Sequence, residues 1–211
     1  ISGSLSKKTL KKLTDLPLKT NSNSKLYPVS VLCGLFHTLL LLSETPTSTD
    51  HLIIGFFSSF RTSQNPIIIP TEGHEPIALF GGRLSSAVVD SEGGIFILRR
   101  AELTSNPLKA LRVQLPNNDF AVSVACCERE YFVAGRSGRV YSSPSEGVLY
   151  YPEEIDFKEV IELKGIKIKE VSGTNKHCLA VSADGRVFGI GNNEYGTMGL
   201  GKTKHFDHFT E

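Results

Sequence analysis

One stretch near the carboxyl end of the chain decides the fold. Residues 171–201 read VSGTNKHCLAVSADGRVFGIGNNEYGTMGLG. A loop of small and polar residues ends at His177, an apolar run follows, and Asp184-Gly185 separates that run from a second one. Asp-Gly between two apolar runs is a hairpin signal, because glycine adopts a positive φ without steric cost. The stretch predicts two antiparallel strands joined by a tight turn, followed by a glycine-rich loop.

The same pattern occurs three more times upstream. An apolar run, a short loop and a second apolar run lie within residues 29–42, 77–90 and 122–134. When the four copies are aligned on the first residue after the loop, the aligned residues are 48, 45 and 47 positions apart: His37, Ser85, Glu130 and His177. Four copies at one spacing indicate an internal repeat, which has to be recognised before any single element is assigned.

Each copy is predicted to form a small antiparallel sheet. Gly93-Gly94 and Ser137-Gly138 stand where Asp184-Gly185 stands in the last copy. The runs alternate imperfectly between apolar and polar residues, which is typical of strands that are buried on both faces. Three to four short strands in a recurring unit of about 47 residues predict a blade of a β-propeller. A solenoid of stacked repeats is the alternative.

We therefore expect an all-β chain, a β-propeller with about four blades. The chain has no Trp, so blades of the Trp-Asp type fit it less well. The four units are expected at approximately residues 1–60, 61–105, 106–150 and 151–211. Residues 1–24 are expected to form a loop or part of a preceding blade.

Composition excludes several classes of protein. The 211 residues contain 23 Lys+Arg and 22 Asp+Glu, a formal net charge of +1, so a broad basic surface for nucleic acid is not expected. Hydrophobic residues make up 40% and charged residues 21%, which is ordinary for a globular domain. A basic cluster near the amino end leaves local nucleic-acid contact as a minor alternative to a short helix or solvated loop: Lys7, Lys8, Lys11 and Lys12.

Cysteine usage favours a reducing compartment, and no membrane span is expected. No two cysteines have the C-x-x-C spacing of a zinc site, so we expect free, buried thiols and a cytoplasmic or nuclear protein. The four are Cys33, Cys126, Cys127 and Cys178. Residues 26–42 carry no Asp, Glu, Lys or Arg. This run is shorter than the roughly 20 apolar residues of a spanning helix.

The repeat resembles that of the regulator of chromosome condensation family. That repeat reads roughly as Gly-x-x-His-Thr, a strand, Asp-Gly, a strand that ends in Trp-Gly, and Asn-x-x-Gly-Gln-Leu-Gly. Gly34-Leu-Phe-His-Thr38 matches its first loop, and Gly191-Asn-Asn-Glu-Tyr-Gly-Thr-Met-Gly199 matches its last element. The second and third copies lack the His, the fourth has one extra residue before it, and Ile190 stands where Trp is usual. The spacing of the resemblance extends over nearly the whole chain, whereas its specific motifs cover only about 30 residues.

The resemblance implies a seven-bladed ring and a binding role. We expect the chain to be part of a longer one, or to associate so that its open blade faces are covered. It implies a non-enzymatic scaffold that binds a protein partner through its loops. In the family's best-known member, the face formed by these loops engages a small GTPase. The corresponding residues are Leu35, Phe36, His37, Arg83, Leu84, Ser85, Glu128, Arg129, Glu130, Thr174, Asn175, Lys176 and His177.

Two other functions remain open at this stage. Guanine-nucleotide exchange on a small GTPase is the first alternative. The family's exchange-active face uses acidic residues, and among the loop residues of this chain only Glu128 and Glu130 are acidic, which counts against exchange. Contact with chromatin or nucleic acid through the basic amino-terminal cluster is the second.

Catalysis, cofactors and metals are not expected. His37 and His177 occupy equivalent repeat positions, which favours a structural role in each blade. Ser182, His177 and Asp184 have the residue types of a catalytic triad, but no G-x-S-x-G elbow is present and Asp184 opens a turn.

Two further motifs have the residue types of ligand sites. The glycines of residues 189–196 are near the spacing of a dinucleotide loop, but no helix pattern follows them. We expect these glycines to permit tight turns and close contacts between blades. His205, Asp207 and His208 carry metal-ligand side chains, and we expect them to form a solvated linker.

Overall fold

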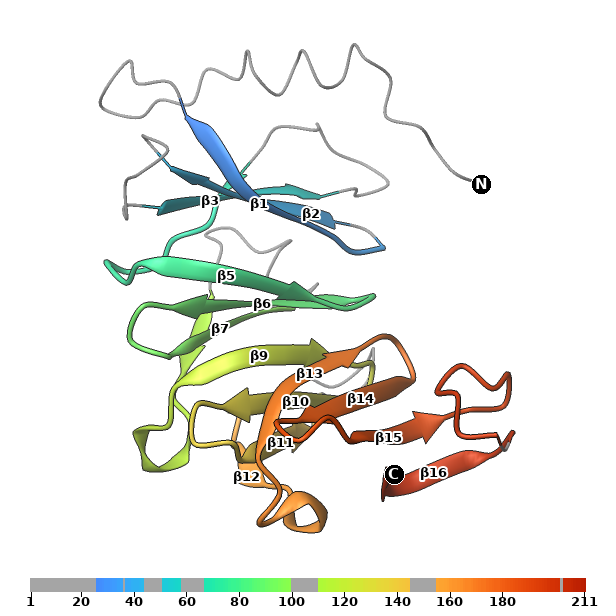
Figure 1. Cartoon of the computed structure of the whole chain (residues 1–211). Helices are drawn as coiled ribbons and strands as arrows, with labels where there is room; N and C mark the ends of the chain where they lie inside the picture. The colour runs from blue at the N-terminus through green and yellow to red at the C-terminus, as the bar shows by residue number, and fades with distance from the viewer. Residues whose placement is uncertain are drawn as a thin grey trace.

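The chain folds into four antiparallel sheets. The computed structural model describes residues 26–35, 37–43, 51–57, 67–99, 110–144, 155–201 and 203–211. Each of the four sheets in this part of the chain has four strands, paired in chain order. The first three follow one another along one direction, with the fourth beside the third (Figure 1). The predicted all-β propeller architecture is confirmed.

We number the sheets blades 1 to 4 in chain order. Blade 1 contains β1 (Tyr27–Cys33), β2 (His37–Ser43), β3 (His51–Phe57) and β4 (Ile67–Ile68). Blade 2 contains β5 (Pro76–Gly81), β6 (Ser85–Asp90), β7 (Ile95–Arg99) and β8 (Leu111–Val113). Blade 3 contains β9 (Ala121–Cys126), β10 (Glu130–Gly135), β11 (Val140–Pro144) and β12 (Lys158–Glu159). Blade 4 contains β13 (Ile168–Gly173), β14 (His177–Ser182), β15 (Val187–Asn192) and β16 (His205–Thr210).

Two short 3-10 turns lie beside the blades. The first is η1 (Pro116–Asn118), which precedes blade 3, and the second is η2 (Ile161–Leu163), which precedes blade 4. The expected unit boundaries after residues 60, 105 and 150, and the segment 1–24, lie outside the described residues. They remain predictions.

The aligned residues of the four repeats mark the same structural position. Each is the first residue of the second strand of its blade: His37 in β2, Ser85 in β6, Glu130 in β10 and His177 in β14. The turns between second and third strands in blades 2, 3 and 4 use the predicted glycines, with φ of 82° at Gly93, 88° at Gly138 and 89° at Gly185. A residue with a Cβ is strained in that region, which explains the recurring glycine.

Neighbouring blades pack through three apolar clusters. Leu39 and Leu41 of blade 1 pack with Val88 of blade 2, and similar clusters join blades 2 and 3 and blades 3 and 4. All six residues of β6 are buried. A strand with a blade on either side has no solvent face, so the imperfect alternation seen in the sequence is a consequence of stacking.

Backbone hydrogen bonds also connect the blades. At the end of the molecule that carries Gly93, Gly138 and Gly185, the turn of one blade accepts a bond from the first strand of the next. The Ala121 amide donates to the Gly93 carbonyl at 3.2 Å, and the Ile168 amide donates to the Gly138 carbonyl at 2.9 Å. We call this the turn end. The opposite end, where first and second strands are joined, is the loop end.

Two expectations from the sequence need correction. The segment with His205, Asp207 and His208 is not a solvated linker, because it forms β16 and pairs with β15. The four cysteines are free, as predicted, but only Cys126, Cys127 and Cys178 are buried, whereas Cys33 is exposed. Among the described residues no helix has the length and apolarity needed to cross a bilayer.

Candidate partner-binding face

The four loops at the loop end share one turn. In each, the amide of a residue three positions before the second strand donates to the carbonyl of that strand's first residue. The distances are 2.8 Å for Gly34 to His37, 2.9 Å for Gly82 to Ser85, 3.0 Å for Cys127 to Glu130 and 3.0 Å for Thr174 to His177. Because the turn is repeated, equivalent side chains of successive blades leave the backbone at equivalent places.

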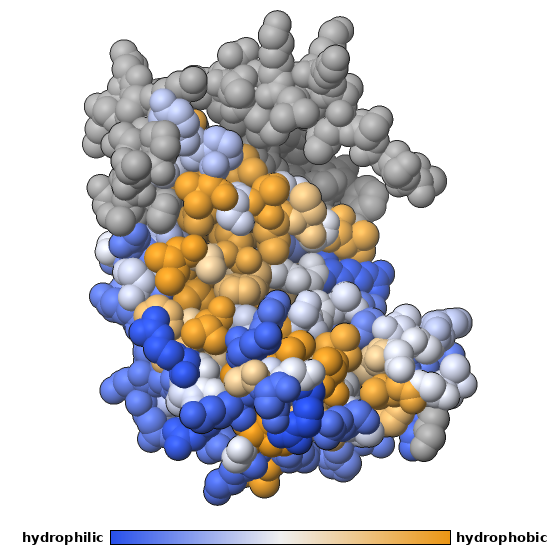
Figure 2. Space-filling model, viewed as in Figure 1, coloured by the Kyte–Doolittle hydropathy of each residue, from blue (hydrophilic) through white to orange (hydrophobic). Residues whose placement is uncertain are grey.

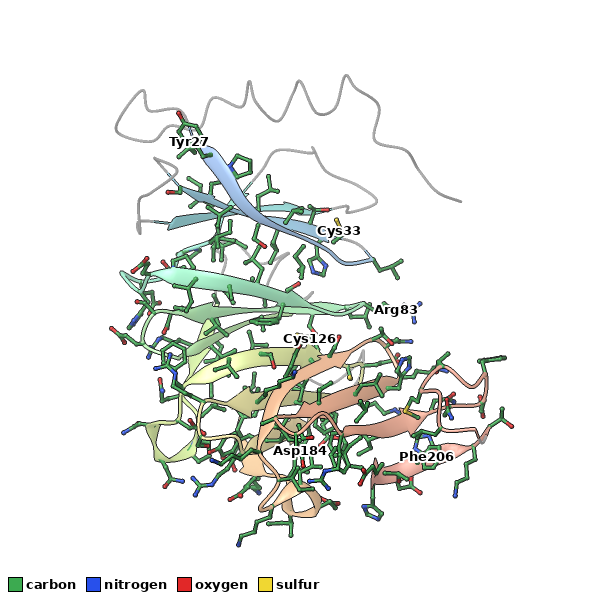
Figure 3. All side chains as sticks on the ribbon, in the orientation of Figure 1. Tyr27, Cys33, Arg83, Cys126, Asp184 and Phe206 are labelled. Atoms are coloured by element: carbon green, nitrogen blue, oxygen red, sulfur yellow. The ribbon has the colours of Figure 1, made fainter. Side chains whose placement is uncertain are left out.

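These loops touch one another across the blades. The Leu35 amide donates to the Arg83 carbonyl at 3.2 Å, and the Glu128 amide donates to the Asn175 carbonyl at 2.8 Å. The Asn175 side chain, oriented to satisfy both neighbours, donates to Glu128 Oε2 at 3.0 Å and accepts from Arg83 Nη1 at 3.2 Å. One contact network therefore joins loops of blades 2, 3 and 4. Cys33 and Arg83 lie along this side of the molecule in Figure 3.

The predicted partner-binding residues differ in exposure. Those exposed to solvent are Leu35, Arg83, Arg129, Thr174 and Lys176, and those half-buried are Leu84, Glu128, Glu130, Asn175 and His177. Together these ten residues define what we call the loop face. His37 and Ser85 are buried at 6% and 7% exposure, so their side chains do not reach solvent. Phe36 lies outside the described residues.

His37 links blade 1 to blade 2. Its Nε2 is hydrogen-bonded to Ser86 Oγ, and burial lowers the pKa of the imidazole. His177, at the equivalent position, is half-buried, and its Nδ1 lies 3.5 Å from Thr174 Oγ1 within its own loop. The two histidines share a backbone position, but only the contact made by His37 supports the expected structural role.

We expect His37→Gln to reduce the loss of stability in mild acid. The folded protein holds His37 with a lowered pKa, so its neutral form stabilises the fold above the unfolded pKa of about 6.5. As the pH falls below that value, the unfolded chain takes up the proton first. The free energy of unfolding then drops by up to about 1.4 kcal/mol per pH unit until the folded pKa is reached. Urea unfolding at several pH values between 7.5 and 5 measures this slope, and an equal slope in His37→Gln would contradict it.

A pocket opens between blades 3 and 4 beside the loop face. It encloses about 400 Å³. Its lining combines apolar and charged side chains from both blades: Cys127, Glu128, Arg129, Glu130, Phe132, Asn175, Lys176, His177, Cys178, Ile190, Gly191, Asn192, His205, Phe206 and Asp207. All three loop-face residues of blade 3 thus line the pocket. Residues of β15 and β16 line it as well, and nothing in the sequence indicated that these strands lie next to the loops.

Burial changes the titration of groups in this pocket. Loss of hydration raises the pKa of Glu130, and the negative charge of Glu162 adds to that rise against a hydrogen bond from Ser142. The pKa of Cys178 is raised by a hydrogen bond with Cys127 and by burial. A thiol with a raised pKa holds its proton and is a poor nucleophile, so the pocket offers a binding group in Glu130 rather than a reactive cysteine.

The three residues of the triad type are not brought together, and the two histidines of β16 each face a carboxylate. Ser182 bonds to Asp184 inside the turn that follows β14, whereas His177 begins that strand. His205 faces Asp207 at 3.2 Å and His208 faces Glu162 at 2.9 Å. The part of the chain that the structure describes holds no group of three His, Cys, Asp or Glu suited to a metal ion.

The glycines of the supposed dinucleotide loop serve close packing. A Cβ on Gly189 would lie 2.8 Å from Met198 Sδ. A Cβ on Gly191, which has a φ of 104°, would lie 2.3 Å from the Lys176 carbonyl oxygen. Both contacts lie within blade 4, so they show close packing inside one blade and not the expected contact between blades.

Comparison with known proteins agrees with this architecture. Residues 168–197 match the model of the regulator of chromosome condensation (RCC1) repeat. The chain is 36% identical over 140 residues to the human probable E3 ubiquitin-protein ligase HERC6, a match that covers 62% of this chain and 13% of that protein.

Solved structures show the same fold at low sequence identity. Human WBSCR16 is 15% identical with a TM-score of 0.67, over 90% of this chain and 53% of that one. Prp20p from Saccharomyces cerevisiae, described with its binding properties to Gsp1p and histones, is 15% identical with a TM-score of 0.66. That match covers 91% of this chain and 51% of Prp20p.

Proposed function

Because this chain is a propeller of the regulator of chromosome condensation repeat family, we propose that it is a binding scaffold that meets a protein partner through the loop face. The observation that carries the proposal is the contact network of Arg83, Glu128 and Asn175, which holds loops of three blades together. Loops already held in place lose little conformational entropy on binding, and this favours affinity.

The chemistry of the loop face suits a protein surface. Three cationic side chains are exposed on it, Arg83, Arg129 and Lys176, with Leu35 at 51% exposure beside them. Arginine and apolar groups inside a polar rim are typical of protein interfaces. Figure 2 shows apolar side chains gathered over the first strands of blades 1 and 2. The exposed large hydrophobic residues include Val29 and Val31 of β1 and Ile77 of β5.

Charge reversal on the loop face is expected to remove partner binding. The variant carries Arg83→Glu, Arg129→Glu and Lys176→Glu, and its control carries the same charge change at exposed lysines away from the loop end: Lys158, Lys167 and Lys169. Quantitative affinity capture compares the two with the unaltered protein. We expect capture of the specific partners to fall by at least about tenfold in the first variant alone. Unchanged capture by the loop variant would contradict the proposal.

Nucleotide exchange is the second candidate. Glu128 and Glu130 place two acidic groups on the loop face, and the structurally similar Prp20p is described as binding Gsp1p. Release of a fluorescent guanine nucleotide from a small GTPase tests it. Faster release that is lost in the Glu128→Ala, Glu130→Ala double variant would establish exchange, and release at the basal rate would exclude it for the GTPase used.

Nucleic-acid contact has no support from the described residues, because the basic cluster at Lys7 to Lys12 lies outside them. The ligase activity in the name of the human relative belongs to a protein of which the match covers 13%, and we do not carry it to this chain. A cytoplasmic or nuclear location, and membership of a longer chain, remain part of the proposal.

A further inference from the structure

We propose that the pocket between blades 3 and 4 receives the side chain of an arginine or lysine of the protein partner, with the charged end at Glu130 and the carbon chain on apolar groups. This inference rests on the proposed function, because it names the chemistry of the partner that the loop face would meet. Three features of the pocket support it: an apolar floor, a half-buried Glu130, and partners already bound to the other carboxylates.

The floor of the pocket is apolar. Phe132, Cys178 and Phe206 are 4%, 0% and 7% exposed, and the half-buried Ile190 lies with them in the lining. Phe206 comes from β16, so the outer strand of blade 4 closes the side of the pocket (Figure 3). The methylene groups of arginine and lysine pack on such surfaces while the charged end seeks a polar group. The volume of about 400 Å³ lies in the range of sites for small organic groups.

Glu130 is the group in this pocket that a cation would stabilise. It is half-buried at the start of β10, and Ser142 offers it a hydroxyl. None of the ion pairs found among the described residues includes it. Loss of hydration and the nearby Glu162 carboxylate make its charge costly. An incoming ammonium or guanidinium group would offset that cost, since a partly buried carboxylate gains more from a hydrogen-bonded cation than an exposed one does.

The other carboxylates of the pocket already have partners at the rim. Glu128 accepts a bond from the Asn175 side chain, and Asp207 lies 3.2 Å from His205. Glu130 is also the sole acid among the four equivalent repeat positions, which are otherwise His37, Ser85 and His177. The carboxylate thus distinguishes blade 3 from the other blades at a position where the fold itself does not require it.

An anionic ligand fits less well, although Arg129 and Lys176 are present. Both are exposed to solvent, where water screens their charge, whereas the half-buried Glu130 lines the pocket. We therefore expect these two cations to face acidic groups of the partner outside the pocket. An uncharged apolar side chain is the competing occupant.

The test uses small probes and needs no identified partner. Butylguanidinium carries the charged end and carbon chain of arginine, and butylurea is its neutral counterpart of nearly the same shape. Titration of the isotope-labelled protein, followed by amide NMR shifts, measures both. We expect saturable binding of butylguanidinium with shifts concentrated at residues 127–130, 175–178 and 190–192. Butylurea is expected to bind at least about tenfold more weakly.

Two variants locate the effect. Glu130→Gln keeps the shape of the side chain and removes its charge, and it is expected to weaken butylguanidinium binding by at least about tenfold. Glu170→Gln, at an exposed carboxylate on β13 outside the pocket, is expected to leave it unchanged. Equal binding of the two probes would assign the pocket to an apolar group and overturn the proposal, and so would the absence of saturable shifts. The comparison of the two probes on the unaltered protein decides the question even if Glu130→Gln does not fold.

Failure of this inference can be told apart from failure of the proposed function. If neither probe binds but charge reversal on the loop face still removes partner capture, only the pocket assignment is wrong. If charge reversal leaves capture unchanged, the proposed function itself fails.

Discussion

Replacing Gly82 with alanine is expected to lower the free energy of unfolding by about 3 kcal/mol, because it forces two blades apart. A Cβ at this position would lie 1.8 Å from the carbonyl oxygen of Cys126. Gly82 follows β5 in blade 2, whereas Cys126 ends β9 in blade 3. The obstacle is backbone and cannot rotate away, so relief requires a shift of one whole loop. Urea unfolding followed by far-ultraviolet circular dichroism measures the change.

The adjacent Gly81 provides the matched control. A Cβ there would approach the Leu32 side chain of blade 1, with the nearest atom at 2.5 Å. Leu32 is half-buried, so its end can re-orient. We expect Gly81→Ala to cost about 1 kcal/mol, since overpacking against a movable side chain lies at the low end of its usual range. Equal losses in the free energy of unfolding of the two variants would show that Gly82 does not lie against the Cys126 carbonyl of the next blade.

Asp90→Asn is expected to destabilise the protein by about 2 kcal/mol at neutral pH. Asp90 is fully buried at the end of β6. Its carboxylate accepts bonds from the amides of Glu92 and Gly94 at 2.9 and 2.8 Å and from Arg112 Nε at 2.7 Å. The asparagine removes the charge that Arg112 faces. Arg112 keeps a bond to Glu92 at 3.0 Å, and this limits the loss.

The same variant has a signature in its pH dependence. Burial disfavours the ionised form of Asp90, but hydrogen bonds from Arg112 and the two amides outweigh it and hold the pKa below its usual value of about 3.8. Ionised Asp90 therefore contributes stability above the unfolded pKa, and this contribution is lost as the pH falls through the folded pKa. In Asp90→Asn, the decrease in the free energy of unfolding that protonation of Asp90 causes in acid is therefore expected to be absent.

Asp184 is the control for Asp90. It lies in the equivalent turn region of blade 4, where its carboxylate bonds to Ser182 and Arg186, but its side chain is 61% exposed. An exposed pair of this kind contributes little to stability. Asp184→Asn is expected to change the free energy of unfolding much less than Asp90→Asn, and the reverse order would contradict the account of both turns.

The spacing of the repeats was enough to predict the blades, because the signals are local. Glycine at a positive φ marks the turn between the second and third strands of a blade, as Gly93, Gly138 and Gly185 show. A loop followed by an apolar run marks the start of a second strand, as it does at His37 and His177. These preferences act within a few residues, so they can be recognised in a single sequence.

The pocket could not be predicted, because it depends on groups that are far apart in the chain. Phe132 and Phe206 come to line one pocket only when blades 3 and 4 have packed and β16 has returned to the edge of its sheet. The segment that forms β16 follows a glycine-rich loop and was interpreted as a linker. The segment does alternate between polar and apolar residues as a strand would, since Phe206 is buried between the exposed His205 and Asp207.

One signal for the site was present in the alignment of the repeats. Glu130 stands where the other blades have His37, Ser85 and His177. Sequence reasoning treated Glu130 as one of several loop residues, although the residue that differs at an otherwise structural position is the better candidate for a specific role. The exposure of Glu130 to a pocket, rather than to open solvent, became visible only with the neighbouring blade in place.

Photo-crosslinking tests most directly whether the loop face is the surface that meets a partner. The residue p-benzoylphenylalanine is placed at Arg129 on the loop face and, in a separate protein, at Lys167 beside Gly138 at the turn end, both of them exposed. We expect a discrete crosslinked adduct between the protein and its partner from position 129 and none from position 167, and we expect the adduct to be lost when Arg83 and Lys176 are changed to glutamate. Adducts of equal yield from both positions, or from position 167 alone, would contradict the assignment of the loop face as the partner-binding surface.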